Sequence, residues 1–175
     1  MHVQMIEDRN YFSASSHGAT MTTSNPTAEI IGGPERFLEA ELSQQIQVLT
    51  ARARAKGSAK GNEALVDLGL KVRQYSTLSL AASGLKPTQR ELGAFLDLDP
   101  SQIVALVDFL EKRGLVVREV DPRDRRSKTI VATEEGLAIH DEATKRLLIA
   151  EGESLKNLTS DEQEQLRELL LKIAF

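Results

Sequence analysis

Two helix-start signals and a basic turn follow one another over residues 88–132, and this order limits the possible folds more than any other feature of the chain. In the segment that opens at Thr88, the hydroxyl can accept the amide of Glu91 while the Glu91 side chain reaches back, which is a capping box. Asp99 is a good N-cap and Pro100 a good first residue for the next helix. We therefore predict short helices over 88–96 and 99–113, joined by a tight turn.

A two-stranded hairpin is predicted directly after the second helix. Residues 115–120 and 128–132 are short and contain β-branched side chains, which favours strands. The turn between them has the composition Asp-Pro-Arg-Asp. Two short helices joined by a tight turn form a helix-turn-helix, and a basic hairpin behind it forms a wing. The predicted fold class is therefore mainly α with a small β-hairpin wing.

Apolar side chains recur at helical spacing on both sides of this region. Before it we predict helices over 34–55 and 63–82, separated by a loop because the segment between them is rich in Gly, Lys and Ser. After it we predict a long helix over 133–153 and a final helix opened by a second capping box at Thr159.

Composition excludes several classes of function. The chain has no cysteine, so disulfides, thiolate zinc sites and thiol redox sensing are excluded. No apolar stretch approaches the roughly 20 residues that a membrane span needs, and the polar start lacks a signal-peptide apolar region, so we expect a cytoplasmic protein. The net charge of −4 is unevenly placed: residues 129–175 hold five basic and ten acidic side chains, whereas residues 86–128 hold nine basic and eight acidic ones.

The second short helix has one apolar and one polar face. Its predicted core residues are Ile103, Leu106, Val107 and Leu110, which leaves Ser101, Gln102, Ala105 and Asp108 on the other side. A recognition helix reads bases mainly with its N-terminal residues, and Gln suits adenine. Two alternatives stay open: Gln102 completes the capping box of Asp99, and Ala105 serves helix propensity alone.

The predicted wing tip carries four cations: Arg123, Arg125, Arg126 and Lys128. Cations on an extended turn suit phosphates or a narrow minor groove. A solvated turn with local Asp–Arg pairs is the alternative.

The segments DPRDRRSKTIVATEEG, LVDFLEKRGLV and RQYSTLSLAA together resemble the multiple-antibiotic-resistance-regulator (MarR) family of winged helix-turn-helix transcriptional regulators, over roughly residues 34–175. The resemblance implies that Arg125 or Arg126 enters the minor groove and that Asp108 pairs with Arg126, bracing the wing. Residues expected at the DNA are Thr88, Gln89, Arg90, Pro100, Ser101, Gln102, Ala105, Arg123, Arg125, Arg126 and Lys128. The family usually has Leu at the position of Ala132 and often a polar side chain at that of Ala105, so we expect specificity to depend more on the wing and on DNA shape.

The resemblance also implies a homodimer, whereas the N-terminal extension is inferred from a composition rich in Ser, Thr, Asn and Gly. We expect a disordered or loosely ordered extension over 1–33, within which Met21 can open a shorter product, and a dimerisation helix and loop over 34–62. The winged helix-turn-helix would cover 63–132 and further dimerisation helices 133–175. The expected function is a dimeric, ligand-responsive repressor of a pseudo-palindromic operator.

No cofactor, metal site or membrane contact is expected, but the family often binds small aromatic, lipid-like or anionic effectors. The family binds such ligands between the dimerisation helices and the DNA-reading part, a region that the first two predicted helices border. The candidate pocket residues are therefore Ile46, Arg73 and Tyr75. An enzyme is the first competing interpretation, resting on His140 beside Asp141 and Glu142, and a solvated helix face explains these residues better. A winged-helix module for protein contacts alone is the second, and salt-dependent DNA binding would distinguish it.

Overall fold

The computed structural model describes residues 33–121 and 124–175. The chain divides into two compact units, residues 1–39 and 40–175. The described part of the first unit contains a single 3-10 turn, Pro34–Phe37. The predicted extension over 1–33 lies almost entirely outside the described residues.

The first long helix, α1, spans Ile46–Ala64, so the predicted helix over 34–55 and the loop after it are both wrong. Residues before α1 form 3-10 segments, the second at Glu41–Gln44, because the extended backbone of Gln45 interrupts the helix. The glycines that indicated a loop lie inside α1. Gly61 is buried, and a Cβ there would lie 2.7 Å from Val72 Cγ2, so this glycine allows close helix packing rather than a turn.

The predicted helix over 63–82 is divided in two. α1 ends at Ala64, a 3-10 turn follows at Val66–Leu68, and α2 spans Val72–Ala82. The break occurs at Gly69, which has a left-handed backbone (φ 61°) that ends the turn. The Asn62 side chain accepts the backbone N–H of Val72 at 2.8 Å and so joins the two helices across the break.

The helix-turn-helix has the predicted form. α3 spans Gln89–Leu96 and α4 spans Pro100–Lys112. The Thr88 hydroxyl accepts the amide of Glu91 at 3.2 Å, and the Glu91 carboxylate accepts the Thr88 amide at 2.7 Å. Asp97 has a left-handed backbone (φ 51°) and ends α3, which turns the chain into α4.

The wing is an antiparallel hairpin of β1, Val116–Val120, and β2, Lys128–Ala132, in which Val116 pairs with Ala132 and Val120 with Lys128. The backbone N–H of Ile130 donates to the Pro87 carbonyl at 2.8 Å. This bond attaches the start of the helix-turn-helix to the wing.

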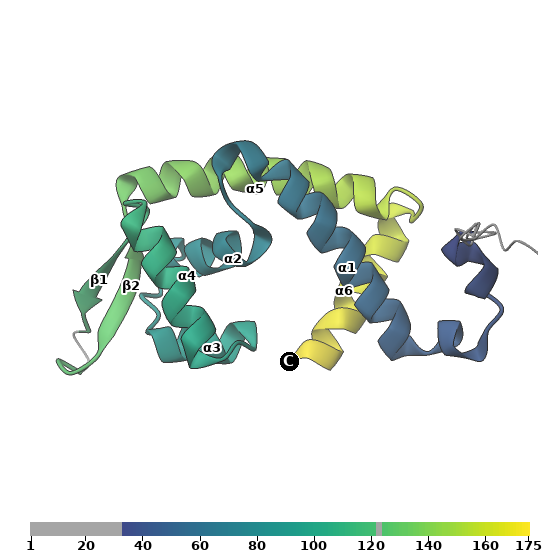
Figure 1. Cartoon of the computed structure of the whole chain (residues 1–175), viewed down its shortest axis with the longest axis horizontal. Helices are drawn as coiled ribbons and strands as arrows, with labels where there is room; N and C mark the ends of the chain where they lie inside the picture. The colour runs from purple at the N-terminus through teal and green to yellow at the C-terminus, as the bar shows by residue number, and fades with distance from the viewer. Residues whose placement is uncertain (1–32, 122–123) are drawn as a thin grey trace, which may run out of the picture. The chain divides into compact units, whose positions relative to one another are not determined.

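The remaining helices are α5, Glu134–Leu155, and α6, Ser160–Ala174. Within residues 40–175, α2 packs under the first part of α5, whereas α1 crosses α5 further along (Figure 1). The core lies inside the winged helix-turn-helix and beneath α5; its fully buried members include Leu65, Leu78, Leu92, Ile103, Leu110, Leu115 and Ile130. In the described part of the chain, no helix is both long and apolar enough to cross a membrane.

Candidate DNA interface and ligand cavity

The two faces of α4 divide as the sequence pattern predicts. Ile103, Val107 and Leu110 are buried, whereas Ser101 and Ala105 are exposed on the opposite side. Gln102 is also exposed, and its side-chain oxygen accepts the Asp99 backbone N–H at 3.2 Å. Gln102 therefore has the capping role that the sequence left open, with its carbonyl oxygen already used.

The start of α3 lies beside α4. Gln89, Arg90 and Pro100 line one hollow of about 260 Å³ together with Val104, an exposed side chain that the predicted site does not include. Arg90 is exposed, whereas Thr88 is half-buried and its hydroxyl is engaged in the capping box. Predicted DNA residues from both helices thus share one surface.

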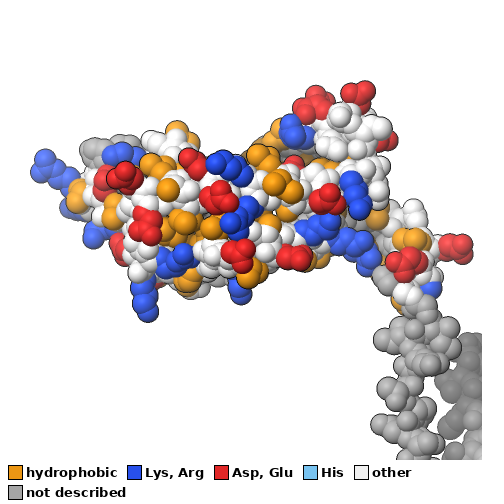
Figure 2. All heavy atoms as spheres, turned by 90° about the horizontal axis from the view of Figure 1, so that it is seen from above, with side chains coloured by type: hydrophobic (Ala, Val, Ile, Leu, Met, Phe, Trp, Pro, Cys, Tyr) orange, Lys and Arg blue, Asp and Glu red, His pale blue; other side chains and the backbone are white. Residues whose placement is uncertain are grey.

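The wing tip is shaped by Asp124, whose two carboxylate oxygens accept the Arg126 backbone N–H at 3.0 Å and the Ser127 hydroxyl at 2.9 Å. Arg125, Arg126 and Lys128 are exposed. Figure 2 shows Lys and Arg side chains projecting at the end of the molecule where the wing lies in Figure 1. Arg123 lies outside the described residues.

The predicted pair between Asp108 and Arg126 is replaced by another pair. Arg118 of β1 donates from Nη2 to Asp108 Oδ1 at 2.5 Å and from Nη1 to the Glu111 carboxylate. Its Nε donates to Gln89 Oε1 of α3 at 3.4 Å. Arg126 lies at the hairpin tip, beyond the last strand pair, whereas Arg118 lies midway along β1 against α4.

The charge of Arg118 is stabilised by these partners. Partial burial of the guanidinium favours the neutral form, but the hydrogen bond to Asp108 and the charges of Glu111 and Asp108 outweigh that effect. The pKa of Arg118 is therefore raised above its ordinary value, and the group is a permanent cation. Sequence reasoning missed this residue, although a cation two residues after the buried Val116 falls on the inward side of a strand and needs acidic partners there.

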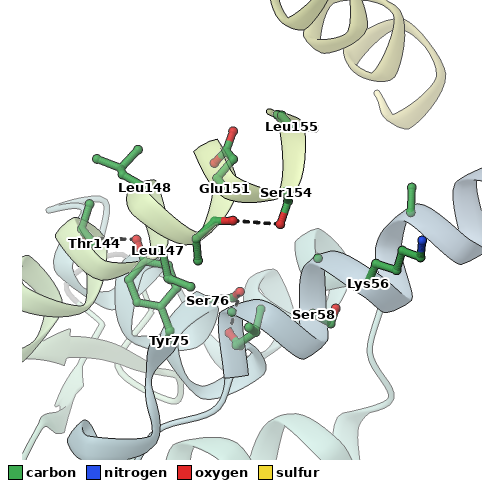
Figure 3. Close-up of a pocket in the computed structure, with 15 residues that line it drawn as sticks. Lys56, Ser58, Tyr75, Ser76, Thr144, Leu147, Leu148, Glu151, Ser154 and Leu155 are labelled. Carbon is green, nitrogen blue, oxygen red and sulfur yellow. Dashed lines mark hydrogen bonds between the residues drawn. The ribbon is translucent and has the colours of Figure 1, made fainter. Parts of the chain in front are cut away.

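A cavity of about 630 Å³ lies between α1, α2 and α5 (Figure 3). Its lining is largely apolar, with Val72 from α2 and Leu147 and Leu148 from α5. Its polar groups include Lys56 and Ser58 of α1 and Glu151 and Ser154 of α5.

Of the three predicted pocket residues, Tyr75 lines this cavity, and Ile46 and Arg73 do not. Tyr75 shares a hydrogen bond of 3.0 Å with the Thr144 hydroxyl, and Figure 3 shows its ring between α2 and α5. Arg73 follows Val72 directly, so it lies about 100° further round α2 and outside the cavity lining. Ile46 is the first residue of α1, and its side chain is 73% exposed.

The side chain of His140, which was considered for an enzyme or metal site, is held by contacts with other side chains of the protein. The His140 ring stacks on Tyr75 with the ring centres 5.7 Å apart, and its Nε2 lies 3.3 Å from the Ser79 hydroxyl. The Glu142 carboxylate accepts a hydrogen bond from Arg146 at 2.9 Å. Over residues 33–121 and 124–175, no three His, Asp or Glu side chains lie close enough to hold a metal ion.

Comparison with known proteins gives these surfaces a context. The MarR family model matches residues 68–127, which span α2 to the wing tip. A MarR-family transcriptional regulator from Rhodococcus sp. RHA1 is 44% identical, with a TM-score of 0.74; the match covers 78% of this chain and 96% of that one. The chain belongs to the MarR family. The resemblance inferred from the sequence and the mainly α, winged helix-turn-helix fold class are thereby confirmed.

Other MarR-family relatives have been solved with bound molecules. CouR from Rhodococcus jostii RHA1, bound to p-coumaroyl-CoA, is 45% identical with a TM-score of 0.71, over 78% of this chain and 96% of that one. A CouR repressor bound to a 23-mer DNA duplex is 29% identical, with the same TM-score and coverage. The regulator YkoM of Bacillus subtilis is 27% identical over 77% of this chain and 87% of its own length. This MarR-family chain is accordingly a transcriptional regulator with a DNA-binding fold.

Proposed function

We propose that this MarR-family regulator acts in the cytoplasm as a homodimer, which represses transcription by binding a pseudo-palindromic operator and leaves DNA when a small organic effector enters the cavity. The observation that carries this proposal is the exposed N-terminal half of α4 beside a basic wing that is bonded to it. The repressor CouR, solved on a DNA duplex, supports it.

The DNA contacts follow from exposure and charge. Ser101 and Ala105 lie on the outward face of α4 and would enter the major groove, with Ala105 available to a thymine methyl group. Arg90 at the start of α3 would contact phosphate. Arg125 and Arg126 would enter the adjacent minor groove, where a narrow groove concentrates negative potential.

Exposed apolar side chains support the homodimer. The second half of α5 exposes Ile149, and α6 exposes Leu169 and Ile173, each by more than half of its surface. A monomer rarely leaves so many large apolar groups on neighbouring helices in water. In such a dimer, two α4 helices about 34 Å apart, one turn of DNA, would match a pseudo-palindrome.

The cavity supports a small-molecule effector. Its volume of about 630 Å³ lies in the range of roughly 300–1,000 Å³ that is typical of ligand pockets. Its largely apolar lining suits a flat organic group. Lys56 of α1 offers a cation to an anionic end, whereas the Glu151 carboxylate of α5 would repel one. CouR from Rhodococcus jostii RHA1 holds p-coumaroyl-CoA, so we propose an aromatic acid or its acyl thioester for this chain.

The wing is tested first. Operator fragments are selected from the genomic DNA of the source organism with the purified protein, and their affinity is then measured by fluorescence anisotropy at several salt concentrations. We expect Arg125→Ala/Arg126→Ala to weaken binding by about 10- to 100-fold. The salt dependence should also become shallower, by about one unit of slope for each phosphate that the variant leaves without a cation.

The matched control is Lys145→Ala/Lys156→Ala. It removes two exposed cations from α5 and its C-cap, outside the predicted DNA contacts. It should bind as the wild type does. If both double variants lost the same operator affinity, the wing result would reflect net charge alone. If the wild type selected no DNA at any salt concentration, a protein-interaction module would be favoured instead.

A further inference from the structure

Arg118 connects three elements of the DNA interface from the middle of the wing. Its side chain is only 17% exposed, although a guanidinium is usually solvated. Its donors reach Asp108 and Glu111 on α4 and Gln89 on α3. A planar guanidinium can serve three acceptors at fixed angles, which a lysine ammonium on its flexible stem cannot do equally well.

The two acidic partners lie where negative charge is unfavourable for DNA binding. Asp108 is seven residues after Ser101 and three after Ala105, so it shares their outward face, and Glu111 is one turn further along α4. Two unpaired carboxylates on a recognition helix would repel the phosphate backbone. Among residues 33–121 and 124–175, Arg118 is the one cation that forms an ion pair with either of them.

The same bonds also help to hold the wing in place. The hairpin has two strands, and its tip extends past the last strand pair, Val120 with Lys128. A two-stranded hairpin is marginally stable without packing against another element. Arg118 adds polar bonds from the middle of β1 to both helices of the helix-turn-helix. Together with the Ile130–Pro87 backbone bond and the buried side chains of Val116 and Ile130, these bonds set the angle between wing and recognition helix.

We propose that Arg118 is a positioning residue of the DNA interface: without touching DNA, it neutralises the carboxylates of Asp108 and Glu111 and holds the wing against α3 and α4. This inference rests on the proposed function, because it concerns affinity for an operator. It differs from a contact role, since the guanidinium donors are directed at protein acceptors.

The test measures operator affinity of the full-length protein by anisotropy, with unfolding temperature and oligomeric state recorded for each variant. Arg118→Met keeps the aliphatic stem and removes the charge. We expect it to weaken binding by about 10- to 100-fold, the range that corresponds to hydrogen bonds of a charged group. Adding Asp108→Asn and Glu111→Gln to this variant removes the unpaired charges and should restore more affinity than the same two changes add to the wild type, because in the wild type Arg118 already neutralises these carboxylates.

Arg146→Ala is the matched control. Arg146 is also a half-buried arginine paired with two acids, Glu142 and Asp67, but it lies on α5 away from the wing. It should change operator affinity by less than about threefold, in the range of pairs between exposed groups. An equal loss in this variant would assign the Arg118 effect to general stability and overturn the proposal.

Arg118→Lys keeps the positive charge and keeps the test decisive if Arg118→Met fails to fold. It is expected to bind more weakly than the wild type because one ammonium cannot hold all three partners. The proposal is overturned if Arg118→Met binds as the wild type does, if Arg118→Lys does so, or if neutralising both acids restores nothing. A wild-type protein that selects no operator would instead refute the proposed function.

Discussion

Single residues determine how closely the wing and α5 approach each other. Gly136 lies in the first turn of α5, buried against the backbone of Leu115 between α4 and β1. Its amide donates to the Thr133 hydroxyl at 2.9 Å, and that hydroxyl donates to the Gly114 carbonyl at 2.7 Å. A Cβ at Gly136 would lie 1.9 Å from the Leu115 carbonyl oxygen, so no side chain fits without moving the backbone.

We predict that Gly136→Ala lowers the free energy of unfolding by about 2–3 kcal/mol, because the helix start must move away from Leu115. Chemical denaturation monitored by circular dichroism measures this. Gly152→Ala is the control on the same helix, since a Cβ there meets nothing within 4 Å. The control should stabilise α5 by about 0.5–1 kcal/mol, the usual gain when alanine replaces an exposed helical glycine. If both variants changed the free energy of unfolding by similar amounts, the close approach at Gly136 would not contribute to stability.

At the scale of elements, capping boxes mark where α3 and α6 begin. α6 starts with the same arrangement as α3: the Thr159 hydroxyl accepts the Glu162 amide at 3.3 Å, and the Glu162 carboxylate accepts the Thr159 amide at 2.8 Å. The hydrogen bond from the Thr159 backbone, with a second from its hydroxyl, holds the pKa of Glu162 below its ordinary value.

The start of α6 should therefore depend on pH. Because the pKa is lowered in the folded state, the stabilisation is fully present above the pKa of an unfolded glutamate, about 4.3, and is lost as the pH falls through the lower folded-state value. An NMR titration of the Glu162 carboxyl should give a higher pKa in Thr159→Ala than in the wild type. Ser160→Ala, which alters the neighbouring hydroxyl, should leave the titration unchanged. The rise should be partial, because alanine keeps the backbone donor, which is the larger cause of the lowered pKa. A pKa that does not respond to Thr159→Ala would contradict the contribution of the hydroxyl.

On the scale of the whole molecule, the cavity and the DNA surface are joined through α2 and α5. Tyr75 lines the cavity and stacks on His140, and the same two helices pack against the helix-turn-helix and the wing. An effector that separates α1 from α5 would therefore move the helix-turn-helix and the wing. Its binding would shift the population from a conformation that binds DNA to one that does not.

We predict that p-coumaroyl-CoA, used as the probe, lowers operator affinity and that Ala53→Trp abolishes this response, because the indole would occupy the cavity that Ala53 lines. Titration calorimetry measures ligand binding, and anisotropy measures operator affinity with and without the ligand. Ala51→Trp is the control, since Ala51 is exposed on α1 and does not line the cavity. A response that persists in Ala53→Trp would locate the effector site elsewhere, and no response in the wild type would exclude this ligand.

Features that depend on local interactions could be predicted from the sequence of this protein. The capping boxes at Thr88 and Thr159, the turn after α3 and the outward face of α4 all depend on residues a few positions apart, so their pattern in the sequence was sufficient.

Tertiary contacts decided the rest. The glycines of α1 did not form a loop, and Gly61 proved to be a packing position because Val72 and Leu147 lie against it. Asp108 pairs with Arg118 rather than with the wing tip because the hairpin register places Arg118 against α4. The cavity collects residues of three helices that are distant in sequence, and no spacing along the chain encodes which side chains meet there.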